Sequence, residues 1–231
     1  MNNILTSGLA QLGLPADGIP ALLKYADALL ETNKVMNLTA ITDPADVATL
    51  HFLDSAALLT LADFAGKKVV DVGTGAGFPG MPLRILEPTI QLTLLDSLNK
   101  RIDFLKEVCV DLGLNDINCV HGRAEEFAAA HRESYDIVTS RAVANLQMLC
   151  ELCLPLVKEG GYFLSMKAVD SDQELKLAYT AIKTLGGQVE QVKDYTIPGT
   201  DVVHRLIFIK KVGPTPTKYP RAFAKIKKAP L

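Results

Sequence analysis

Residues 69–80 read VVDVGTGAGFPG. An apolar run that contains one acid is followed by three glycines, each separated from the next by one residue. The apolar run predicts a buried strand, and the glycines predict a turn in which a ligand can approach the backbone. Pro79 and Pro82 suit the first turn of a helix, where the missing N–H is not needed. Together these features predict a nucleotide site at the carboxyl edge of a parallel sheet.

Two classes of nucleotide cofactor fit such a turn. The glycines 75, 77 and 80 match the G-x-G-x-x-G pattern of dinucleotide enzymes, which is a weak signal by itself. Asp71 instead resembles the acid of the first motif in class I S-adenosylmethionine-dependent methyltransferases. A carboxylate there suits a cofactor with a sulfonium and an amino group, whereas it would repel a pyrophosphate. Asp96, at the end of the next apolar run, can bind ribose hydroxyls in either class, so a nucleotide-dependent dehydrogenase stays open at this point.

Strand-like and helical segments alternate around this turn. This alternation predicts an α/β fold, with a parallel sheet covered by helices on both faces. Two strands near the end, 187–195 and 202–211, are joined by a turn, which makes the last strand antiparallel to its neighbour and favours the methyltransferase architecture over a dinucleotide fold. The remaining strands are predicted at 68–72, 90–95, 117–120, 135–139 and 162–166, and helices at 82–86, 98–112, 124–130, 145–157 and 171–185.

The chain divides into three predicted parts: an N-terminal helical extension (1–65), a cofactor-binding domain (66–212) and a basic C-terminal tail (213–231). In the extension, helices are predicted at 21–31 and 44–64. Residues 210–231 contain seven Lys or Arg and no acid, and prolines are expected to keep them extended. Basic side chains neutralise phosphates and exposed aromatic rings stack on unpaired bases, so this tail is predicted to bind RNA.

Composition limits the other possibilities. At 231 residues and a formal net charge of −2, the chain is long enough for a full core and carries no global sign of nucleic-acid binding. Because it has neither a long apolar run nor a signal-peptide pattern, we expect a cytoplasmic protein without membrane contact. The four cysteines lie in apolar or helical segments and are predicted to pack in the core rather than to bind metal. No exposed apolar seam stands out, and a monomer is expected.

Several further stretches narrow the family. They are NLTAI at 37–41, HFLDS at 51–55, RAEE at 123–126, SRAVA at 140–144, Lys167, HR at 204–205 and KYPR at 218–221. In order and spacing, together with the glycine turn, they resemble the RsmG family, the bacterial 16S ribosomal RNA guanine-N7 methyltransferases long called glucose-inhibited division protein B. Two departures are the absence of tryptophan near Thr32 and the residues 222–224, where the family tends toward Lys-Ala-Gly.

The resemblance implies a role for particular residues. Arg141 is placed to face both the cofactor and the acceptor base, and Lys167 to hold the base or its phosphates; His51 and Asp54 are further positioning candidates. The cofactor site implied by the resemblance comprises Gly73, Gly75, Gly77, Phe78, Asp96, Ser97, Leu98, Ala124, Glu125 and Arg141. The implied RNA contacts are Arg205, Lys218, Tyr219, Arg221, Lys225, Lys227 and Lys228.

The reaction implied is transfer of a methyl group from S-adenosylmethionine, which leaves S-adenosylhomocysteine, to N7 of a guanine (expected position 527) in 16S ribosomal RNA or the small ribosomal subunit. Guanine N7 already presents a lone pair, so we expect no metal and no single catalytic residue, and orientation of the two reactants supplies much of the barrier lowering. Three alternatives remain open: methylation of another RNA or small molecule, a dehydrogenase, and a non-catalytic ribosome-assembly factor.

Overall fold

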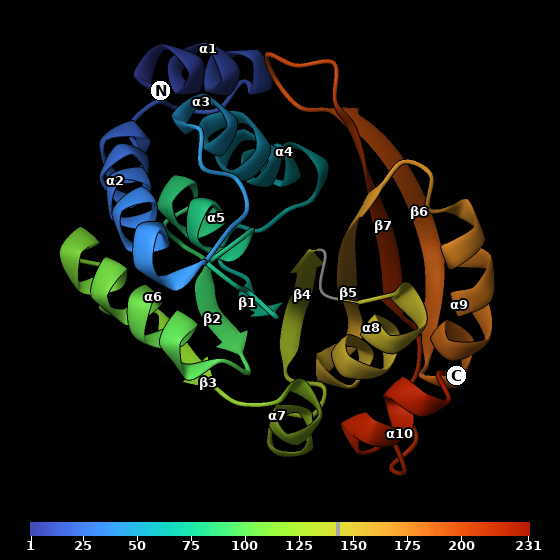
Figure 1. Ribbon diagram of the computed structural model, residues 1–231. Helices are drawn as coiled ribbons and strands as arrows, with labels where there is room; N and C mark the ends of the chain where they lie inside the picture. Colours follow the sequence, from blue (N-terminus) through green and yellow to red (C-terminus); the bar gives the residue numbers. More distant parts are fainter. Residues whose placement is uncertain (142–143) are drawn as a thin grey trace.

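A seven-stranded sheet forms the centre of the computed structural model, which describes residues 1–141 and 144–231 (Figure 1). Ala142 and Val143, which belong to the SRAVA motif, lie outside the described residues. The strands follow the order β3-β2-β1-β4-β5-β7-β6 across the sheet. Their bounds are β1 (Lys68–Val72), β2 (Gln91–Asp96), β3 (Asn118–His121), β4 (Tyr135–Arg141), β5 (Val157–Ala168), β6 (Gly187–Thr196) and β7 (Val203–Lys211).

The first five strands pair in parallel, and β7 runs antiparallel to both β5 and β6. A tight turn causes this reversal, because it leaves no room for a crossover helix. The backbone N–H of Ile197 donates to the carbonyl of Val202 at 2.9 Å, and Gly199 takes a φ of 76° within the turn. The predicted α/β fold with a reversed last strand is confirmed.

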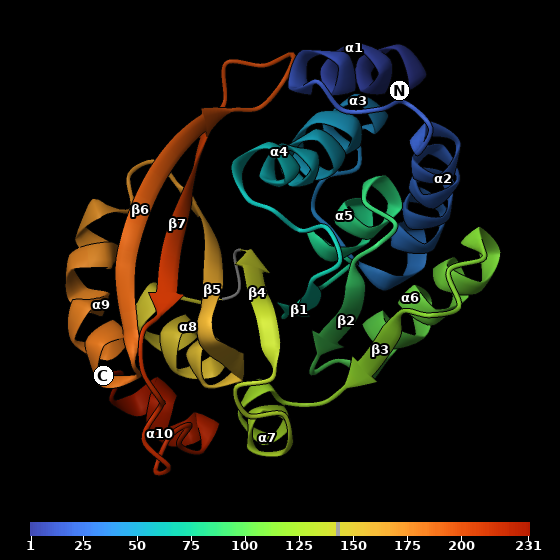
Figure 2. The ribbon, with the colours of Figure 1, turned by 180° about the vertical axis from the view of Figure 1, so that it is seen from behind.

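Helices cover the two faces of the sheet (Figures 1 and 2). Each face has its own hydrophobic core, because successive strand residues point to opposite sides: Leu164 of β5 joins one core and Phe163 the other. The first face carries α1 (Asn2–Leu12), α2 (Ile19–Met36), α3 (Pro44–Asp46), η1 (Val47–Leu53), α4 (Asp54–Leu61), α5 (Gly80–Leu86) and α6 (Asn99–Leu112). The second carries α7 (Ala124–Ala130), α8 (Leu146–Cys153), η2 (Leu154–Leu156), α9 (Asp172–Thr184) and α10 (Phe223–Lys228).

The N-terminal helices share a core with the sheet domain. Leu29 of α2 and Phe52 of η1 are fully buried in the same cluster as Met81 of α5 and Leu105 of α6. The β6–β7 turn also reaches these helices (Figures 1 and 2), and Ile197 in that turn is fully buried in this cluster. The division at residues 65 and 212 stays a prediction.

The helix predicted at 44–64 changes its winding. The carboxylate of Asp43 accepts hydrogen bonds from the backbone N–H groups of Ala45 and Asp46 and so begins α3. The following segment, η1, is π-helical, and the α-helical geometry resumes at Asp54. Such wide turns occur frequently at functional sites, and this one contains His51.

The C-terminal tail is folded, which corrects the expectation of an extended segment. Tyr219 is 8% exposed and Ile226 is fully buried, both in the second core. Arg221 forms two hydrogen bonds, of 2.8 and 2.6 Å, with the buried carboxylate of Glu151 on α8. Lys211 is 1% exposed and donates to Glu133 and Thr215. The tail packs because its apolar residues and Arg221 find partners on the second face of the sheet.

The cysteines occupy packing positions. Cys150 and Cys153 are fully buried in the second core, and burial raises the pKa of both thiols. The four thiols are free, and Cys119 is half-buried. Among the described residues, no helix is long and apolar enough to cross a membrane.

Candidate active site

The glycine turn folds back on the neighbouring strand. The backbone N–H groups of Gly73 and Thr74 both donate to the carbonyl of Leu95, at 2.8 and 3.1 Å. Gly73, Gly75 and Gly77 have φ values of 69°, 62° and 105°, which only glycine adopts readily. This conformation exposes backbone rather than side chains at the carboxyl edge of β1.

Asp71 organises the turn from inside. It is fully buried, and one of its carboxylate oxygens accepts hydrogen bonds from the hydroxyl of Thr74 at 2.7 Å and the N–H of Gly80 at 3.0 Å. Burial raises the pKa of Asp71 to about 6. Asp71 does not line the cavity above the turn. Its contribution is to fix the backbone.

Tyr25 of α2 supports the turn from the N-terminal helices. Its hydroxyl donates to the carbonyl of Ala76, and its ring stacks on Phe78 with the centroids 5.6 Å apart. Gly77 lies against the Tyr25 hydroxyl and does not line the cavity, and an added Cβ there would lie 2.8 Å from both Leu105 and Met81. The sequence gives no sign of this role for Tyr25, which lies within the helix predicted at 21–31.

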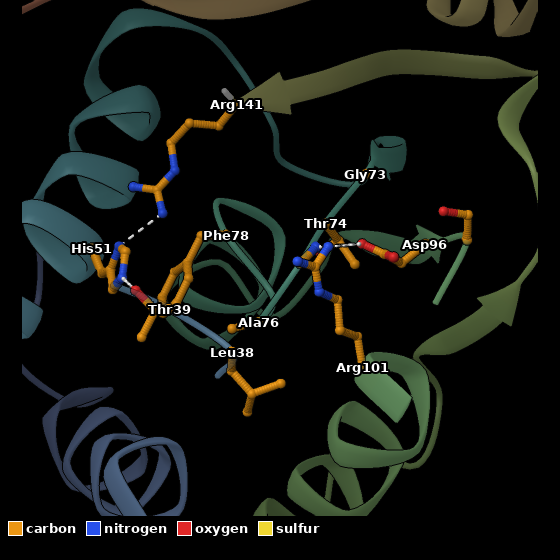
Figure 3. A pocket seen from close by; sticks show the side chains of 12 residues that line it. Leu38, Thr39, His51, Gly73, Thr74, Ala76, Phe78, Asp96, Arg101 and Arg141 are labelled. Carbon is orange, nitrogen blue, oxygen red and sulfur yellow. Dashed lines mark hydrogen bonds and ion pairs between the residues drawn. The ribbon is translucent and has the colours of Figure 1, made fainter. Parts of the chain in front are cut away.

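A cavity of about 380 Å³ opens above the turn (Figure 3). Of the predicted cofactor residues, Gly73, Gly75, Phe78, Asp96, Ser97 and Arg141 line it, together with the positioning candidate His51. Sequence reasoning missed Leu38, Thr39, Thr74, Ala76 and Arg101. The NLTAI motif was the available signal for Leu38 and Thr39, and Arg101 gave none. Leu98 does not line the cavity, and its N–H instead donates to Asp96 at 2.9 Å.

Asp96 ends β2 at the cavity wall and is held in place. One carboxylate oxygen accepts from the N–H of Gly75 at 2.9 Å and from Arg101 at 3.3 Å. The carboxylate has about four acceptor positions, so it can still accept from a ligand hydroxyl. Within the described ranges, the buried Nε of Arg101 has no hydrogen-bond partner.

A second cavity, of about 130 Å³, adjoins the first. The two share Gly73, Asp96 and Ser97 in their walls. Ala124 and Glu125, predicted to frame the adenine, line the second cavity and not the first. The structure therefore brings the predicted cofactor residues, except Gly77 and Leu98, to two neighbouring cavities that share Asp96 in their walls.

Arg141 connects three parts of the chain. From the end of β4 its guanidinium donates to the carbonyl of Leu50 at 2.9 Å, to Asp54 at 3.1 Å and to Nδ1 of His51 at 2.8 Å. Asp54 is fully buried, and its other oxygen accepts from Tyr195 and His204 at 2.8 Å each. Arg141 is thus part of a buried network between η1, α4, β4 and the β6–β7 hairpin, rather than of a surface ion pair.

His51 is held as a neutral imidazole. Arginine stays charged and only donates, so Nδ1 of His51 accepts from Arg141 and Nε2 carries the proton toward Thr39 Oγ1, 2.8 Å away (Figure 3). Burial and the Arg141 charge lower the pKa of His51 to about 3. The imidazole also stacks on Phe78 at a centroid distance of 4.2 Å. The hydrogen bond to Asp54 raises the pKa of His204.

A third cavity, of about 530 Å³, borders His51 and Arg141. Lys167 lines it, with its ammonium donating to the carbonyl of Ala144 at 2.8 Å and to Glu174 at 2.7 Å. His51 and Arg141 line both this cavity and the one above the glycine turn. The remaining lining residues are Ile41, Leu50, Met166, Ala168, Val202 and His204.

The predicted RNA contacts fall into two groups. Lys218, Lys225, Lys227 and Lys228 are exposed. The others are held by the fold: Tyr219 is buried, Arg221 pairs with the buried Glu151, and Arg205 is 8% exposed and paired with Asp194 and Asp172 at 2.6 Å. The expectation of an exposed stacking ring at Tyr219 is wrong, while the RNA roles of the set stay predictions. In the part of the chain that the structure covers, no cluster of metal-ligating side chains occurs.

Comparison with known proteins gives consistent matches. A model of the GidB family, described as rRNA small subunit methyltransferase G, matches residues 18–203. The chain is 48% identical to the ribosomal RNA small subunit methyltransferase G of Alkaliphilus metalliredigens, over 99% of this chain and 98% of the relative. It is 47% identical to the protein of that name from Clostridium botulinum strain Loch Maree, over 90% of this chain and 89% of the relative.

Solved structures with the same fold include methyltransferases. A SAM-dependent methyltransferase from Aquifex aeolicus superposes with a TM-score of 0.55 at 16% identity, over 74% of this chain and 94% of that protein. TYW2 from M. jannaschii, solved in complex with AdoMet, gives a TM-score of 0.56 at 12% identity, over 69% of this chain and 75% of that protein. These similarities concern the fold alone.

Proposed function

This chain belongs to the GidB family, rRNA small subunit methyltransferase G, and on that premise we propose that it methylates N7 of a guanine in 16S ribosomal RNA with S-adenosylmethionine as donor. The observation that carries the proposal is that two cavities border each other at His51 and Arg141, which line both. A methyltransferase needs one space for the donor and one for the acceptor, with the reacting atoms meeting where the spaces join.

The cavity above the glycine turn suits the donor. The carboxylate of Asp96 offers acceptors for ribose hydroxyls, and the turn at 73–76 leaves room, because a Cβ at Gly75 would meet only a carbonyl at 4.0 Å. The guanidinium of Arg141 has five N–H groups, and three hydrogen bonds to Leu50, Asp54 and His51 use part of them. The remaining donors suit the carboxylate of an amino-acid end. Bound S-adenosylmethionine supplies an electrophilic methyl carbon there.

The third cavity suits the acceptor base. Ile41, Met166 and Val202 give it an apolar wall that favours a flat heterocycle and excludes water. Arg141 and the ammonium of Lys167 add donors at its edge, which suit the carbonyl oxygen of guanine or a nearby phosphate. The acceptor position would border the donor cavity at His51 and Arg141, which line both.

The residues around the acceptor orient it and remove no proton. Guanine N7 has an in-plane lone pair and needs no base. His51 is unsuited to that role, because Nδ1 accepts from Arg141 and its pKa is lowered to about 3. Holding two reactants in line can lower the barrier by roughly 7–11 kcal/mol. Arg141, fixed by Asp54, Leu50 and His51, is the residue that we assign to this positioning.

The exposed cations of the tail support an RNA substrate. Lys218, Lys225, Lys227 and Lys228 are solvent-accessible within one segment that has no acidic residue. Such a group binds phosphates without reading sequence, and its contribution weakens as salt is raised. We therefore assign to these lysines the affinity for RNA and to the third cavity the choice of base.

The test is methyl transfer from labelled S-adenosylmethionine to small ribosomal subunits from cells that lack this gene. The RNA is then treated with borohydride and aniline, which cleave at 7-methylguanosine. One new cleavage in 16S RNA is expected. Label without cleavage would reject N7, and no label on subunits or on stripped RNA would reject the function. Arg141→Lys, which keeps the charge but loses the planar donor fork, should lower turnover about 100-fold.

A further inference from the structure

The second cavity has a wall that comes from the far end of the chain. Phe223, the first residue of α10, lines this space of about 130 Å³ together with Asp96, Ala124 and Glu125. The guanidinium of Arg123, the residue before α7, lies 5.4 Å from the centre of the Phe223 ring. The residues on either side of Phe223 are exposed, whereas Phe223 is half-buried. The ring is therefore turned toward the cavity rather than toward solvent.

The order of the three cavities sets the direction of the donor. The methyl group must face the acceptor space, which meets the cavity above the glycine turn at His51 and Arg141. The adenosine end therefore points the other way, past the ribose acceptor Asp96, into the second cavity. At about 130 Å³ this cavity is smaller than the roughly 300–1,000 Å³ of a whole-ligand pocket, and suits one ring system of a ligand.

The chemistry of the second cavity suits a purine. Val72, Leu95 and Leu152 give it apolar walls, and Phe223 adds an aromatic ring. Aromatic rings stack on nucleic-acid bases irrespective of their sequence, because every base has a π-face. Glu125, also in the lining, offers acceptors for an exocyclic amine.

The tail that carries Phe223 is firmly attached on both sides of it. Before it, Arg221 pairs with the buried Glu151 on α8, and Arg132 donates to the carbonyls of Tyr219, Thr215 and Pro216. After it, Ile226 is fully buried, and Gln147 of α8 donates to the carbonyl of Leu231 at 2.8 Å. Figures 1 and 2 show α10 beside α7 and α8.

We infer that Phe223 forms a wall of the adenine end of the donor site, so that the C-terminal tail is part of the cofactor-binding apparatus and not only a surface for RNA. The inference rests on the proposed function. Because Lys225, Lys227 and Lys228 are exposed on the same six-residue helix, α10 presents its cations to solvent while its first residue contacts the donor cavity. The same short helix, α10, would therefore contact RNA through these lysines and the donor through Phe223.

The experiment measures binding of S-adenosylhomocysteine by calorimetry, without RNA. Phe223→Ala should weaken binding between about 5-fold and 150-fold, the range of losses when a ring stacked on a base is truncated. Phe223→Tyr, which keeps the ring, should restore affinity to within about 3-fold of wild type, since stacking is retained. Tyr179→Ala is the matched control, because Tyr179 is an aromatic residue of α9 that is 52% exposed. It should leave the dissociation constant unchanged.

A fluorescence measurement separates contact from a merely structural effect. The chain has no tryptophan, so Phe223→Trp introduces a single indole. Its emission should change on addition of S-adenosylhomocysteine, with the midpoint at the calorimetric dissociation constant. The emission of the Tyr179→Trp variant should not change.

Two results would overturn the inference alone: unchanged affinity in Phe223→Ala while the wild-type protein binds, or an indole at position 223 that does not respond to saturating S-adenosylhomocysteine. Failure of the wild-type protein to bind S-adenosylhomocysteine would instead overturn the proposed function, and the inference with it.

Discussion

Replacing His51 by glutamine should change how the stability of the protein depends on pH. In the unfolded chain the imidazole has a pKa of 6.5, and in the folded protein burial and Arg141 lower it to about 3. Below pH 6.5 the unfolded chain therefore binds a proton that the folded protein does not bind. Unfolding is favoured as the pH falls, and this contribution to stability is lost progressively down to about pH 3.

The size of the effect follows from the two pKa values. Each pH unit inside this window is worth about 1.4 kcal/mol. Between pH 7 and pH 5 the wild-type protein should lose about 2 kcal/mol of unfolding free energy through His51 alone. Over the whole window the loss is about 4–5 kcal/mol. His51→Gln can still accept from Arg141 and donate toward Thr39, but it cannot be protonated.

Urea denaturation at pH 7, 6 and 5 measures the difference. The unfolding free energy of wild type should fall more steeply than that of His51→Gln, by about 2 kcal/mol over the two pH units. His204, whose pKa is raised by Asp54, is present in both proteins and cancels to first order. His121→Gln removes an exposed histidine and serves as the control. Parallel curves for wild type and His51→Gln would refute the assignment of a buried neutral imidazole.

Three further outcomes are expected. Gly77→Ala should lower the free energy of unfolding by about 3–5 kcal/mol and weaken S-adenosylhomocysteine binding, because the new Cβ adds overpacking to an unfavourable φ. The control is Gly13→Ala, at a φ of 69° with open space around it. It should lower the free energy of unfolding by about 1–2 kcal/mol, measured by chemical denaturation, and leave binding unchanged. Arg221→Gln should lower the free energy of unfolding by about 2–4 kcal/mol, because it leaves the buried carboxylate of Glu151 without its cation. Adding Glu151→Gln should recover part of that loss, and strictly additive effects of the two substitutions would contradict the coupling. Cys119, half-buried and with its pKa lowered by the neighbouring thiol, should be alkylated first when labelling is followed by mass spectrometry, and faster labelling of a fully buried thiol would contradict the packing described here.

The fold was predictable from the sequence because its determinants are local and repeated. Apolar runs of strand length alternate with amphipathic helices, and the short turn at 197–202 permits only an antiparallel return. Segment ends were less certain: the helix predicted at 145–157 ends at Cys153, and β5 begins at Val157. Position in the chain also placed Gly73, Gly75, Phe78, Asp96 and Arg141 at one cavity, because carboxyl ends of parallel strands meet at one edge.

Several residues singled out in the sequence have surroundings in the structure that differ from the prediction. Asp71 was predicted to suit a cationic cofactor by its charge, but its carboxylate is buried, and Thr74 and Gly80 donate to one of its oxygens. Lys211 and Tyr219 belong to the basic stretch 210–231, which was predicted to be extended and to bind RNA, yet both side chains are buried against the second face of the sheet. Composition reports the charge of a segment, while burial depends on whether a complementary surface exists elsewhere in the fold.

The sequence by itself determined the order of strands and helices, the glycine turn and the family, because these depend on residues that are neighbours along the chain. Only the tertiary structure decided which distant side chains share the site. Arg141, His51, Asp54 and His204 lie in four elements, and their network exists because the β6–β7 hairpin packs on the N-terminal helices. Phe223 reaches the second cavity in the same way, through contacts made far from it in the sequence. Such contacts have no period or local motif, since they arise from the packing of whole elements.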